Sequence, residues 1–317
     1  MIKKLAREKF NKIFQRFDEA EYLDYFKVED FEGLKAFPYY CMSFGTRLNG
    51  FLYHYDKYMD DTIIIFCHGI GGGHSSYMRE IDALARRGFI VLGFDYTGCN
   101  ISEGESSIGL SSSVRDLYSV IKSLKEDEHF KDKKIYTIGH SWGAFASLAV
   151  NNFIHVDKVV GLAPFASLKI VYRAFFPLLL RPLLIPIAYS IEKERTGEFA
   201  EANVVDAINR SDVKSMIVVS ENDPMIPYKS NSLYIKNKVD KGNLTFKVIS
   251  GRHHQPQYTS EASNYFFEKE SLFNKGIKEK KIVTLEDRIN YFKDVDFKKA
   301  TDQDESLWDE IKEFFLN

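Results

Sequence analysis

The feature that most constrains this chain is an abrupt change of pattern around Ser141. A β-branched and aromatic run at residues 134–138 ends in Gly-His-Ser-Trp-Gly at residues 139–143, and alanine-rich helical spacing follows at once. A serine flanked in this way predicts a strained strand-to-helix turn, because glycines let the two backbones pass closely. The turn lifts the hydroxyl out of the sheet and beside the free N–H groups of the helix. Ser141 is therefore the candidate nucleophile.

Continuous apolar runs recur on both sides of this turn. They occupy residues 62–67, 89–94, 134–138, 158–162, 215–219 and 244–249. Such runs are typical of parallel strands covered on both faces. Helical patterns separate them, which predicts an α/β fold with a mostly parallel central sheet and helices on both faces. Earlier, residues 39–55 alternate loosely and predict an antiparallel pair of strands, with turns at Gly45 and Gly50.

No strand pattern occurs between residues 168 and 211, a stretch rich in Leu, Phe and Ile and interrupted by prolines. We expect a helical cap here, inserted between two parts of the core at 36–167 and 212–317. Its apolar residues Phe175, Phe176 and Leu179 are candidate substrate contacts.

The two ends of the chain have patterns of their own. Residues 1–35 predict an N-terminal helical extension, with an amphipathic helix that continues towards Tyr25. The tail from Glu268 onward is charged and finishes in an amphipathic helix. The apolar face of that final helix carries Leu307, Ile311, Phe314 and Phe315.

Composition narrows the class of protein. A formal net charge of -2 argues against a nucleic-acid partner. The three cysteines form no C-x-x-C pair and favour free thiols in a reducing compartment. The basic N-terminus lacks the apolar segment of a signal peptide, and prolines interrupt the apolar run at 174–191, so no transmembrane helix is expected. These features indicate a cytoplasmic protein and leave its oligomeric state open.

A serine hydroxyl needs a base, and a third group must orient that base. Asp223 follows the run at 215–219 and is favoured over Glu221, which lies closer to the strand; alternatively, Asp223 only starts the turn. The last run leads into two histidines. The spacing from the preceding glycine and the Gln-Pro that follows favour His254 as the base, with His253 as the alternative.

An oxyanion hole requires backbone N–H groups from the residue after the nucleophile and from the loop after an early central strand. Trp142 and Ile70 occupy these places. The glycine-rich loop at 68–74 lacks the spacing of a phosphate-binding loop. Its His68 and His74 have no carboxylate or cysteine at ligand spacing, so we expect them to brace the loop rather than bind metal. His68 is also a candidate substrate contact.

On these residues the chain resembles α/β-hydrolases of the serine aminopeptidase and monoglyceride-lipase type, from about Tyr39 to the C-terminus except for the cap. The resemblance rests on five motifs in order. They are H-G-x-G at 68–71, D-x-x-G-x-x-x-S at 95–102, G-x-S-x-G at 139–143, N-D-P-M-I-P at 222–227 and H-x-P at 254–256.

The resemblance implies a Ser141–Asp223–His254 triad, an oxyanion hole from the Ile70 and Trp142 amides, and no cofactor. Two departures are expected to reshape the pocket. Trp142 replaces the smaller residue common after the nucleophile, and Asn100 stands where glycine is frequent.

The sequence therefore predicts a serine hydrolase that cleaves carboxylic esters through an acyl-enzyme. The apolar cap favours a small-molecule ester or amide with an apolar group, as in a carboxylesterase or monoacylglycerol-lipase-like enzyme. Peptidase, amidase or acyltransferase chemistry on the same triad remains an alternative. A non-catalytic binding protein with the same fold is another.

Overall fold

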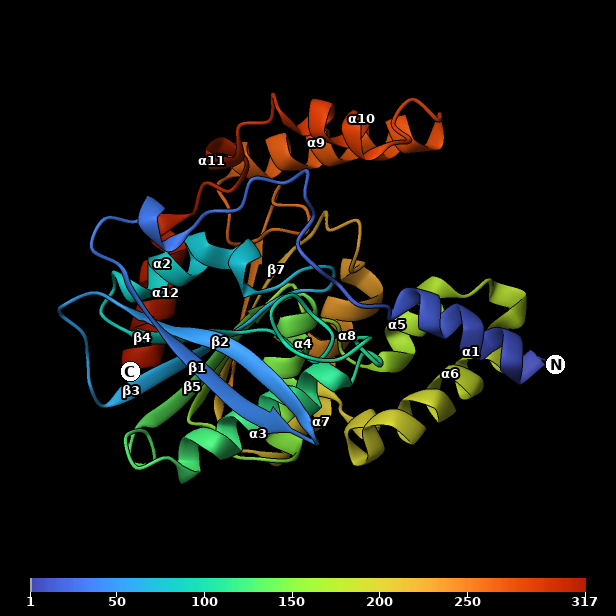
Figure 1. Ribbon diagram of the computed structural model, residues 1–317. Coiled ribbons are helices and arrows are strands. Elements are labelled where there is room, and N and C mark those ends of the chain that lie inside the picture. The colour runs from blue at the N-terminus through green and yellow to red at the C-terminus, as the bar shows by residue number, and fades with distance from the viewer. Residues whose placement is uncertain (1) are drawn as a thin grey trace.

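A computed structural model describes residues 2–317, apart from the side chains of residues 2, 3, 5, 174 and 175. Within this range eight strands form one sheet in the order β1-β2-β4-β3-β5-β6-β7-β8 (Figure 1). The strands β3 to β8 are parallel, and β1 and β2 are antiparallel additions at one edge. The prediction of a mostly parallel α/β fold is confirmed. The strand bounds are Lys35–Ser43, Thr46–His54, Thr62–Cys67, Ile90–Phe94, Lys134–His140, Lys158–Leu162, Lys214–Ser220 and Leu244–Ile249 for β1 to β8.

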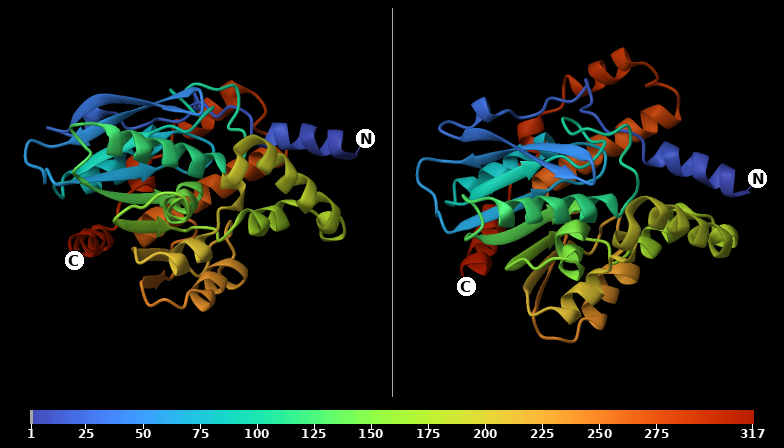
Figure 2. Two further views of the ribbon diagram at one scale, coloured as in Figure 1. Left: turned by 90° about the horizontal axis from the view of Figure 1, so that it is seen from below. Right: turned by 60° about the horizontal axis from the view of Figure 1, so that its bottom comes forward.

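Helices cover both faces of the sheet because alternate residues of the central strands point in opposite directions. In β3, Ile63 and Ile65 belong to the apolar core that includes α3 (Ser112–Glu126) and α4 (Trp142–Ala149). Ile64 and Phe66 belong to the core under α2 (Met78–Ala85) and α12 (Glu305–Leu316). All four side chains are fully buried. Figure 2 shows these two helical layers from further directions.

The β1–β2 hairpin turns at Gly45, as predicted, with a φ of 88° that favours glycine. The second predicted turn is wrong, because Gly50 lies inside β2 and pairs with Phe94. A Cβ at Gly50 would come within 2.2 Å of the Gly93 carbonyl oxygen. Glycine at this position therefore serves the close approach of β2 and β4, not a reversal of the chain.

The N-terminal helix α1 (Ile2–Ile13) is shorter than predicted, and only a 3-10 turn at Val28–Asp30 follows before β1. The helix ends because the next backbone groups bond elsewhere. Phe17 donates its N–H to the Gly98 carbonyl oxygen at 2.9 Å and accepts from the Asn100 N–H at 2.7 Å. This segment is therefore fixed along the loop after β4 and does not continue the helix.

Between β6 and β7 the chain forms α5 (Leu168–Phe175), a 3-10 turn at Leu178–Leu180, α6 (Arg181–Thr196), a 3-10 turn at Gly197–Glu201 and α7 (Val204–Arg210). Helix α1 lies beside α6 (Figures 1 and 2), and Arg7 pairs with Glu194 at 2.7 Å. In contrast, α7 packs against α4 in the core. We call residues 168–201, which exclude α7, the β6–β7 insertion.

After β8 the chain leaves the core a second time. Helices α9 (Ser260–Lys278), α10 (Leu285–Phe292) and α11 (Phe297–Ala300) form a projection, at the top of Figure 1, that the sequence analysis did not predict. Its two ends lie side by side, since Thr259 N–H donates to the Asp302 carbonyl oxygen at 2.9 Å. We call residues 260–302 the C-terminal excursion.

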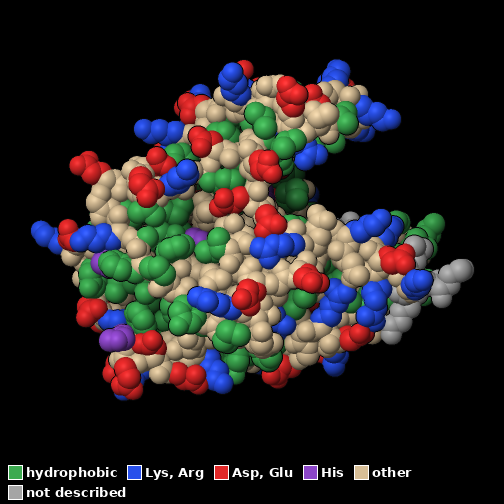
Figure 3. All heavy atoms as spheres, viewed as in Figure 1, with side chains coloured by type: hydrophobic (Ala, Val, Ile, Leu, Met, Phe, Trp, Pro, Cys, Tyr) green, Lys and Arg blue, Asp and Glu red, His purple; other side chains and the backbone are tan. Residues whose placement is uncertain are grey.

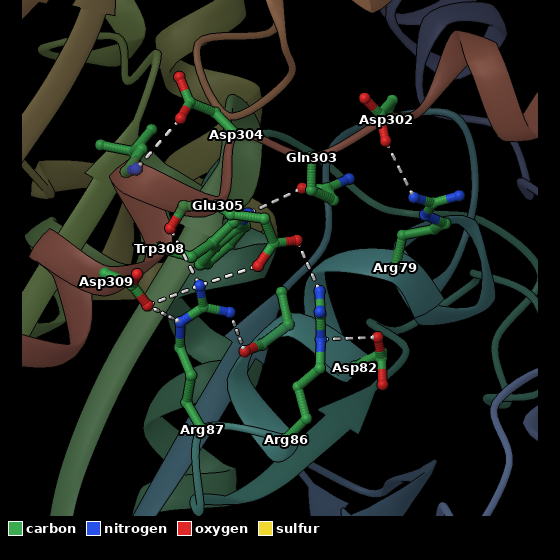
Figure 4. A network of polar contacts seen from close by, with 12 residues as sticks. Arg79, Asp82, Arg86, Arg87, Asp302, Gln303, Asp304, Glu305, Trp308 and Asp309 are labelled. Carbon is green, nitrogen blue, oxygen red and sulfur yellow. Dashed lines mark hydrogen bonds and ion pairs between the residues drawn. The ribbon is translucent and has the colours of Figure 1, made fainter.

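The predicted final helix is α12, and it returns to the sheet, where the burial of Leu307, Ile311 and Phe315 holds it. Polar contacts with the residues directly after α2 add to this packing (Figure 4). Arg86 and Arg87 pair with Glu305 at 2.8 and 2.9 Å. The remaining regular elements are α8 (Leu233–Lys238) and short turns at His74–Tyr77, Val150–Asn152 and Tyr228–Ser232. In the described part of the chain, no helix combines the length and apolarity needed to cross a membrane.

Candidate active site

Ser141 stands on a sharp turn between β5 and α4. Its φ of 55° and ψ of -109° are unusual for a residue with a side chain, and such a conformation costs of order 1–3 kcal/mol. The two flanking glycines make the turn possible. A Cβ at Gly143 would lie 1.9 Å from the Cys67 carbonyl oxygen, and one at Gly139 would lie 2.5 Å from the Gly143 oxygen. The predicted reason for glycine at both positions is thus visible in the backbone.

The amide of Trp142 begins α4 directly after Ser141, and the Ile70 amide lies in the loop after β3. His68 stabilises this loop, because its Nδ1–H donates to the Gly69 carbonyl oxygen at 2.7 Å. The Nε2 of His68 accepts from the Tyr96 N–H at 3.2 Å. His68 is completely buried, so it braces the loop and does not line the pocket described below.

His74 also braces a loop. Its Nδ1–H and its backbone N–H donate to Asp95 Oδ1 at 2.8 and 2.6 Å, and its Nε2 accepts from the Tyr53 hydroxyl at 3.0 Å. Among the described residues, no group of three or more His, Cys, Asp or Glu side chains is arranged to hold a metal ion. Asn100, in the same loop as Asp95, keeps the left-handed conformation of a glycine, with a φ of 39°.

Asp223 follows β7 in a turn that its own carboxylate stabilises. Oδ1 accepts from the N–H groups of Met225 and Ile226 at 2.8 and 2.9 Å. Oδ2 accepts from His254 Nδ1–H at 2.7 Å. The competing acid, Glu221, is exposed and accepts instead from the Ser250 hydroxyl at 3.1 Å. The structure therefore brings Asp223, and not Glu221, to a histidine.

The two adjacent histidines have different surroundings. His254 donates to Asp223, which leaves its Nε2 without a proton and able to accept one. His253 points elsewhere: its ring stacks on Phe267 at a centroid distance of 4.0 Å, and its Nε2–H donates to Asn264 at 3.0 Å. His254 also lines the same pocket as Ser141, whereas His253 does not.

His140, inside the turn motif, connects three loops of the site. Its Nε2–H donates to the His254 carbonyl oxygen at 2.7 Å, and its Nδ1 accepts from the Tyr77 hydroxyl at 3.0 Å. Tyr77 in turn accepts from the Gly69 N–H at 3.1 Å. Burial and the neighbouring His254 lower the pKa of His140 to about 3, so this ring stays neutral. The sequence offered no sign of this role.

The side chain of Trp142 is turned into the core. Its indole N–H donates to the Leu110 carbonyl oxygen at 2.6 Å, and its ring packs edge-on against Tyr96. Only 1% of Trp142 is exposed. The expected reshaping of the pocket therefore does not take the form of a bulky group at its centre. Instead, Trp142 fixes the position of Leu110, which forms part of the wall.

A buried carboxylate joins this wall to the β6–β7 insertion. Glu192 of α6 accepts from the Leu110 N–H and the Ser111 hydroxyl, both at 2.6 Å, and from the Tyr172 hydroxyl. It is completely buried, which raises its pKa. A Cβ at Gly109 would lie 2.5 Å from a Glu192 oxygen, so only glycine leaves room for this contact.

Ser141 and His254 open into a pocket of about 380 Å³ beneath the β6–β7 insertion and the loop after β7. Its walls are mainly apolar, and its charged lining residues are two arginines. The lining residues are Ile70, Leu110, Ser141, Trp142, Phe165, Ile170, Val171, Arg173, Arg181, Met225, Ile226, Pro227, Ser230 and His254.

The predicted substrate contacts in the insertion are placed differently. Leu179 is 92% exposed at the tip of the insertion, and Phe176 stacks on Tyr172 and packs against the core. Neither lines the pocket. The side chain of Phe175 lies outside the described residues. The apolar wall comes largely from residues near strand ends and from α5, such as Phe165 and Val171, which apolar content alone could not single out.

We call residues 250–259, the loop between β8 and α9 that carries His253 and His254, the histidine loop. A second pocket, also of about 380 Å³, lies on the other side of this loop. Residues 22–26 and the C-terminal excursion form most of it, and Tyr77 and Gln255 contribute from the core. Its walls are rich in aromatic rings, and its charged lining residues are Asp24, Lys269 and Glu270. Figure 3 shows a notch beside the α9–α10 hairpin with hydrophobic side chains at its base.

Comparisons with known proteins agree with this architecture. A family model described as "alpha/beta hydrolase fold" matches residues 62–186. An esterase from Pyrococcus furiosus is 18% identical, with a TM-score of 0.57 over 84% of this chain and 98% of that one. The α/β hydrolase GrgF from Penicillium sp. sh18 is 16% identical, with a TM-score of 0.55 over 77% of this chain and 97% of that one.

A third similar structure is Est1E from Butyrivibrio proteoclasticus with bound ferulic acid. It is 19% identical, with a TM-score of 0.51 over 73% of this chain and 98% of that one. No curated protein sequence gives a significant match. The sheet order, the turn at Ser141 and the family match over residues 62–186 show that this chain has the α/β-hydrolase fold.

Proposed function

We propose that this protein is a serine hydrolase that cleaves carboxylic esters through an acyl-enzyme and needs no cofactor. The observation that carries the proposal is the 2.7 Å bond between Asp223 and His254 Nδ1 beside a pocket that also contains Ser141. An oriented, neutral imidazole next to a serine on a strained turn is the arrangement that activates a hydroxyl.

In the first half of the reaction, Ser141 Oγ attacks the ester carbonyl carbon while His254 Nε2 takes the hydroxyl proton. Asp223 keeps the ring in the correct tautomer and stabilises the imidazolium. The negative charge on the former carbonyl oxygen faces the Ile70 and Trp142 amides. His254 then gives its proton to the leaving alkoxide, the C–O bond breaks, and the acyl group remains on Ser141.

In the second half, His254 takes a proton from water, and the hydroxide attacks the acyl carbon. The tetrahedral intermediate collapses, Ser141 recovers its proton from His254, and the carboxylic acid leaves. The apolar pocket supports an acyl group with an apolar body. In this proposal the cap predicted at residues 168–211 is the β6–β7 insertion at 168–201. Helix α7 belongs to the core with residues 36–167 and 212–317, from which the C-terminal excursion projects.

A fluorophosphonate probe tests the nucleophile. We expect the purified protein to be labelled and Ser141→Ala to be unlabelled, with ester hydrolysis reduced by about 10⁴-fold or more. Esters of 4-nitrophenol with increasing acyl length supply the activity readout. An unlabelled wild-type protein without esterase activity would favour a non-catalytic binding protein and overturn the proposal.

The two histidines provide a matched pair for the base. His254→Ala should lose nearly all activity, whereas His253→Ala should keep most of it, because His253 stacks on Phe267 and does not line the pocket. Thermal melting of both variants checks that they fold. Full activity of His254→Ala would contradict the assigned base.

A further inference from the structure

The pocket that contains Ser141 has an uneven charge distribution. Besides His254, its only charged lining residues in the described part of the chain are Arg173 and Arg181, and no aspartate or glutamate lines it. Arg173 lies near the end of α5, and Arg181 begins α6. Two positive charges therefore border an apolar cavity that provides no carboxylate for either of them.

Neither arginine has an acidic partner among the described residues. Arg181 donates its Nε–H to the Phe176 carbonyl oxygen at 3.0 Å, and this bond orients the side chain while its two terminal nitrogens make no hydrogen bond. Arg173 makes no hydrogen bond or ion pair with the part of the chain that the structure describes, and it is exposed, whereas Arg181 is half-buried. The guanidinium groups are thus available to a ligand.

The two glutamates of α6, Glu192 and Glu194, have partners elsewhere. Glu192 of α6 has its oxygens bonded to Leu110, Ser111 and Tyr172, and it is not a lining residue. Glu194 of the same helix pairs with Arg7 of α1. Other cations of the insertion have partners of their own; Lys193, for example, pairs with Glu201 at 3.1 Å.

We propose that the acyl group of the substrate ends in an anion, a carboxylate or a phosphate, that Arg173 and Arg181 bind at the cap side of the pocket; this rests on the proposed esterase function. Guanidinium groups match both anions with two parallel N–H···O bonds. The apolar wall, which includes Ile170 and Val171, accommodates the chain between the ester carbon and the anion. The substrate class is therefore an ester of an ω-anionic acyl group.

A pair of esters with equal chain length tests this directly. One is the mono-4-nitrophenyl ester of a linear dicarboxylic acid, and the other is the 4-nitrophenyl ester of the monocarboxylic acid of the same length. We expect the wild type to favour the carboxylate-ended ester by about tenfold in kcat/KM at low salt, as charge-assisted hydrogen bonds allow. Added salt should reduce the preference, because Arg173 is exposed.

The double variant Arg173→Gln/Arg181→Gln should lose this preference, so that its kcat/KM values for the two esters become about equal. The ratio of the two values cancels any change in folding or chemistry that affects both esters alike. Arg173→Glu/Arg181→Glu should turn the preference towards an acyl group that ends in an ammonium. Arg210→Gln, an exposed change on α7 away from the pocket, is the control for net charge and should behave as wild type.

Inhibition of neutral-ester hydrolysis identifies the anion. Linear alkyl carboxylates and alkyl phosphates are compared with the alcohol of the same length in wild type and in the double glutamine variant. The proposal is supported if either anion inhibits the wild type more strongly than the alcohol does and if this difference disappears in the variant. The anion that inhibits more strongly then shows whether the acyl group ends in a carboxylate or a phosphate. Equal inhibition by the alcohol would overturn it.

The outcomes separate this inference from the proposed function. If no ester is hydrolysed and the fluorophosphonate does not label Ser141, the esterase function itself fails. If neutral esters are hydrolysed but the wild type shows no preference for the anion, only the inference about Arg173 and Arg181 fails. A double variant that loses both esters equally contradicts it as well.

Discussion

The β6–β7 insertion and the C-terminal excursion are two projections from one core with the α/β-hydrolase fold, and each borders a pocket of about 380 Å³ beside the histidine loop. Only the pocket of the β6–β7 insertion contains Ser141 and His254. Its charges are the cations Arg173 and Arg181, whereas the other pocket contains Asp24, Lys269 and Glu270. The two pockets are thus similar in size but differ in their charges, and Ser141 and His254, which follow β5 and β8, line only the first.

Each projection is also connected to a buried glutamate, and the two glutamates act in different ways. Glu192 belongs to the β6–β7 insertion and receives hydrogen bonds from the pocket wall. Glu80 belongs to α2 of the core and accepts from Gln257, at the base of the C-terminal excursion, at 3.1 Å. The first glutamate therefore links the insertion to the wall beside Ser141, while the second contacts the base of the C-terminal excursion through Gln257.

The largest expected effect compares Asp223, which bonds to the histidine of the first pocket, with Asp24, which lines the second. Asp223→Asn should lower kcat by about 10⁴-fold, because an amide no longer holds His254 in the tautomer that accepts the serine proton. Asp24→Asn, in the second pocket, is the matched control and should leave kcat within about twofold, since Asp24 contacts no group of the proposed triad. Steady-state hydrolysis of a short 4-nitrophenyl ester measures both, and equal losses would contradict the assignment of the reacting pocket.

The next effect concerns the glutamate beneath the C-terminal excursion. Burial raises the pKa of Glu80 from 4.5 to about 7 in the folded protein. A raised pKa means that the contribution of this carboxyl to stability is fully present below pH 4.5 and is lost as the pH rises to about 7. Relative to Glu80→Gln, the wild type should therefore lose up to about 3 kcal/mol of unfolding free energy across this window.

Urea unfolding at several pH values measures this difference. Glu32→Gln, at an exposed position, provides the control and should follow the wild type at every pH. A difference between wild type and Glu80→Gln that stays constant from pH 4.5 to 7 would show that Glu80 does not titrate in this way.

The smallest expected effect comes from substitutions that place a tryptophan ring in each pocket in turn. Val171→Trp should reduce kcat/KM for long acyl esters by about tenfold while short esters change little, because Val171 lines the pocket that contains Ser141. Asn274→Trp places the same ring in the second pocket and should not alter the preference for acyl length. A series of 4-nitrophenyl esters measures both variants. If Asn274→Trp shifts the length preference and Val171→Trp does not, the roles of the pockets are reversed.

The core and its two projections differ in how much of their structure the sequence predicts. The parallel strands and the turn at Ser141 were predictable because burial on both faces and close backbone contact restrict residue type strongly, as at Gly143. The residues at strand ends could be proposed for the same reason, and the structure brings Asp223 to His254. Their catalytic roles remain proposals.

The sequence did not predict the C-terminal excursion. Its helices expose charged faces, and their inward contacts are made by aromatic side chains. Phe292, for example, stacks on Tyr22 from the N-terminal segment, with the two ring centroids 5.4 Å apart. Such a contact joins distant parts of the chain and leaves no local pattern. The pocket wall was missed for a similar reason: exposed Leu179 and pocket-lining Val171 are both apolar, and only the fold separates them.

The central claim is that chemistry occurs in the pocket of the β6–β7 insertion, at Ser141. A crystal structure of the protein after reaction with an alkyl 4-nitrophenyl phosphonate tests it most directly. We expect the phosphorus bonded to Ser141 Oγ, a phosphonate oxygen facing the Ile70 and Trp142 amides, and the alkyl chain along Val171. Phosphorus on another residue, or an alkyl chain seated beneath α9, would contradict the account.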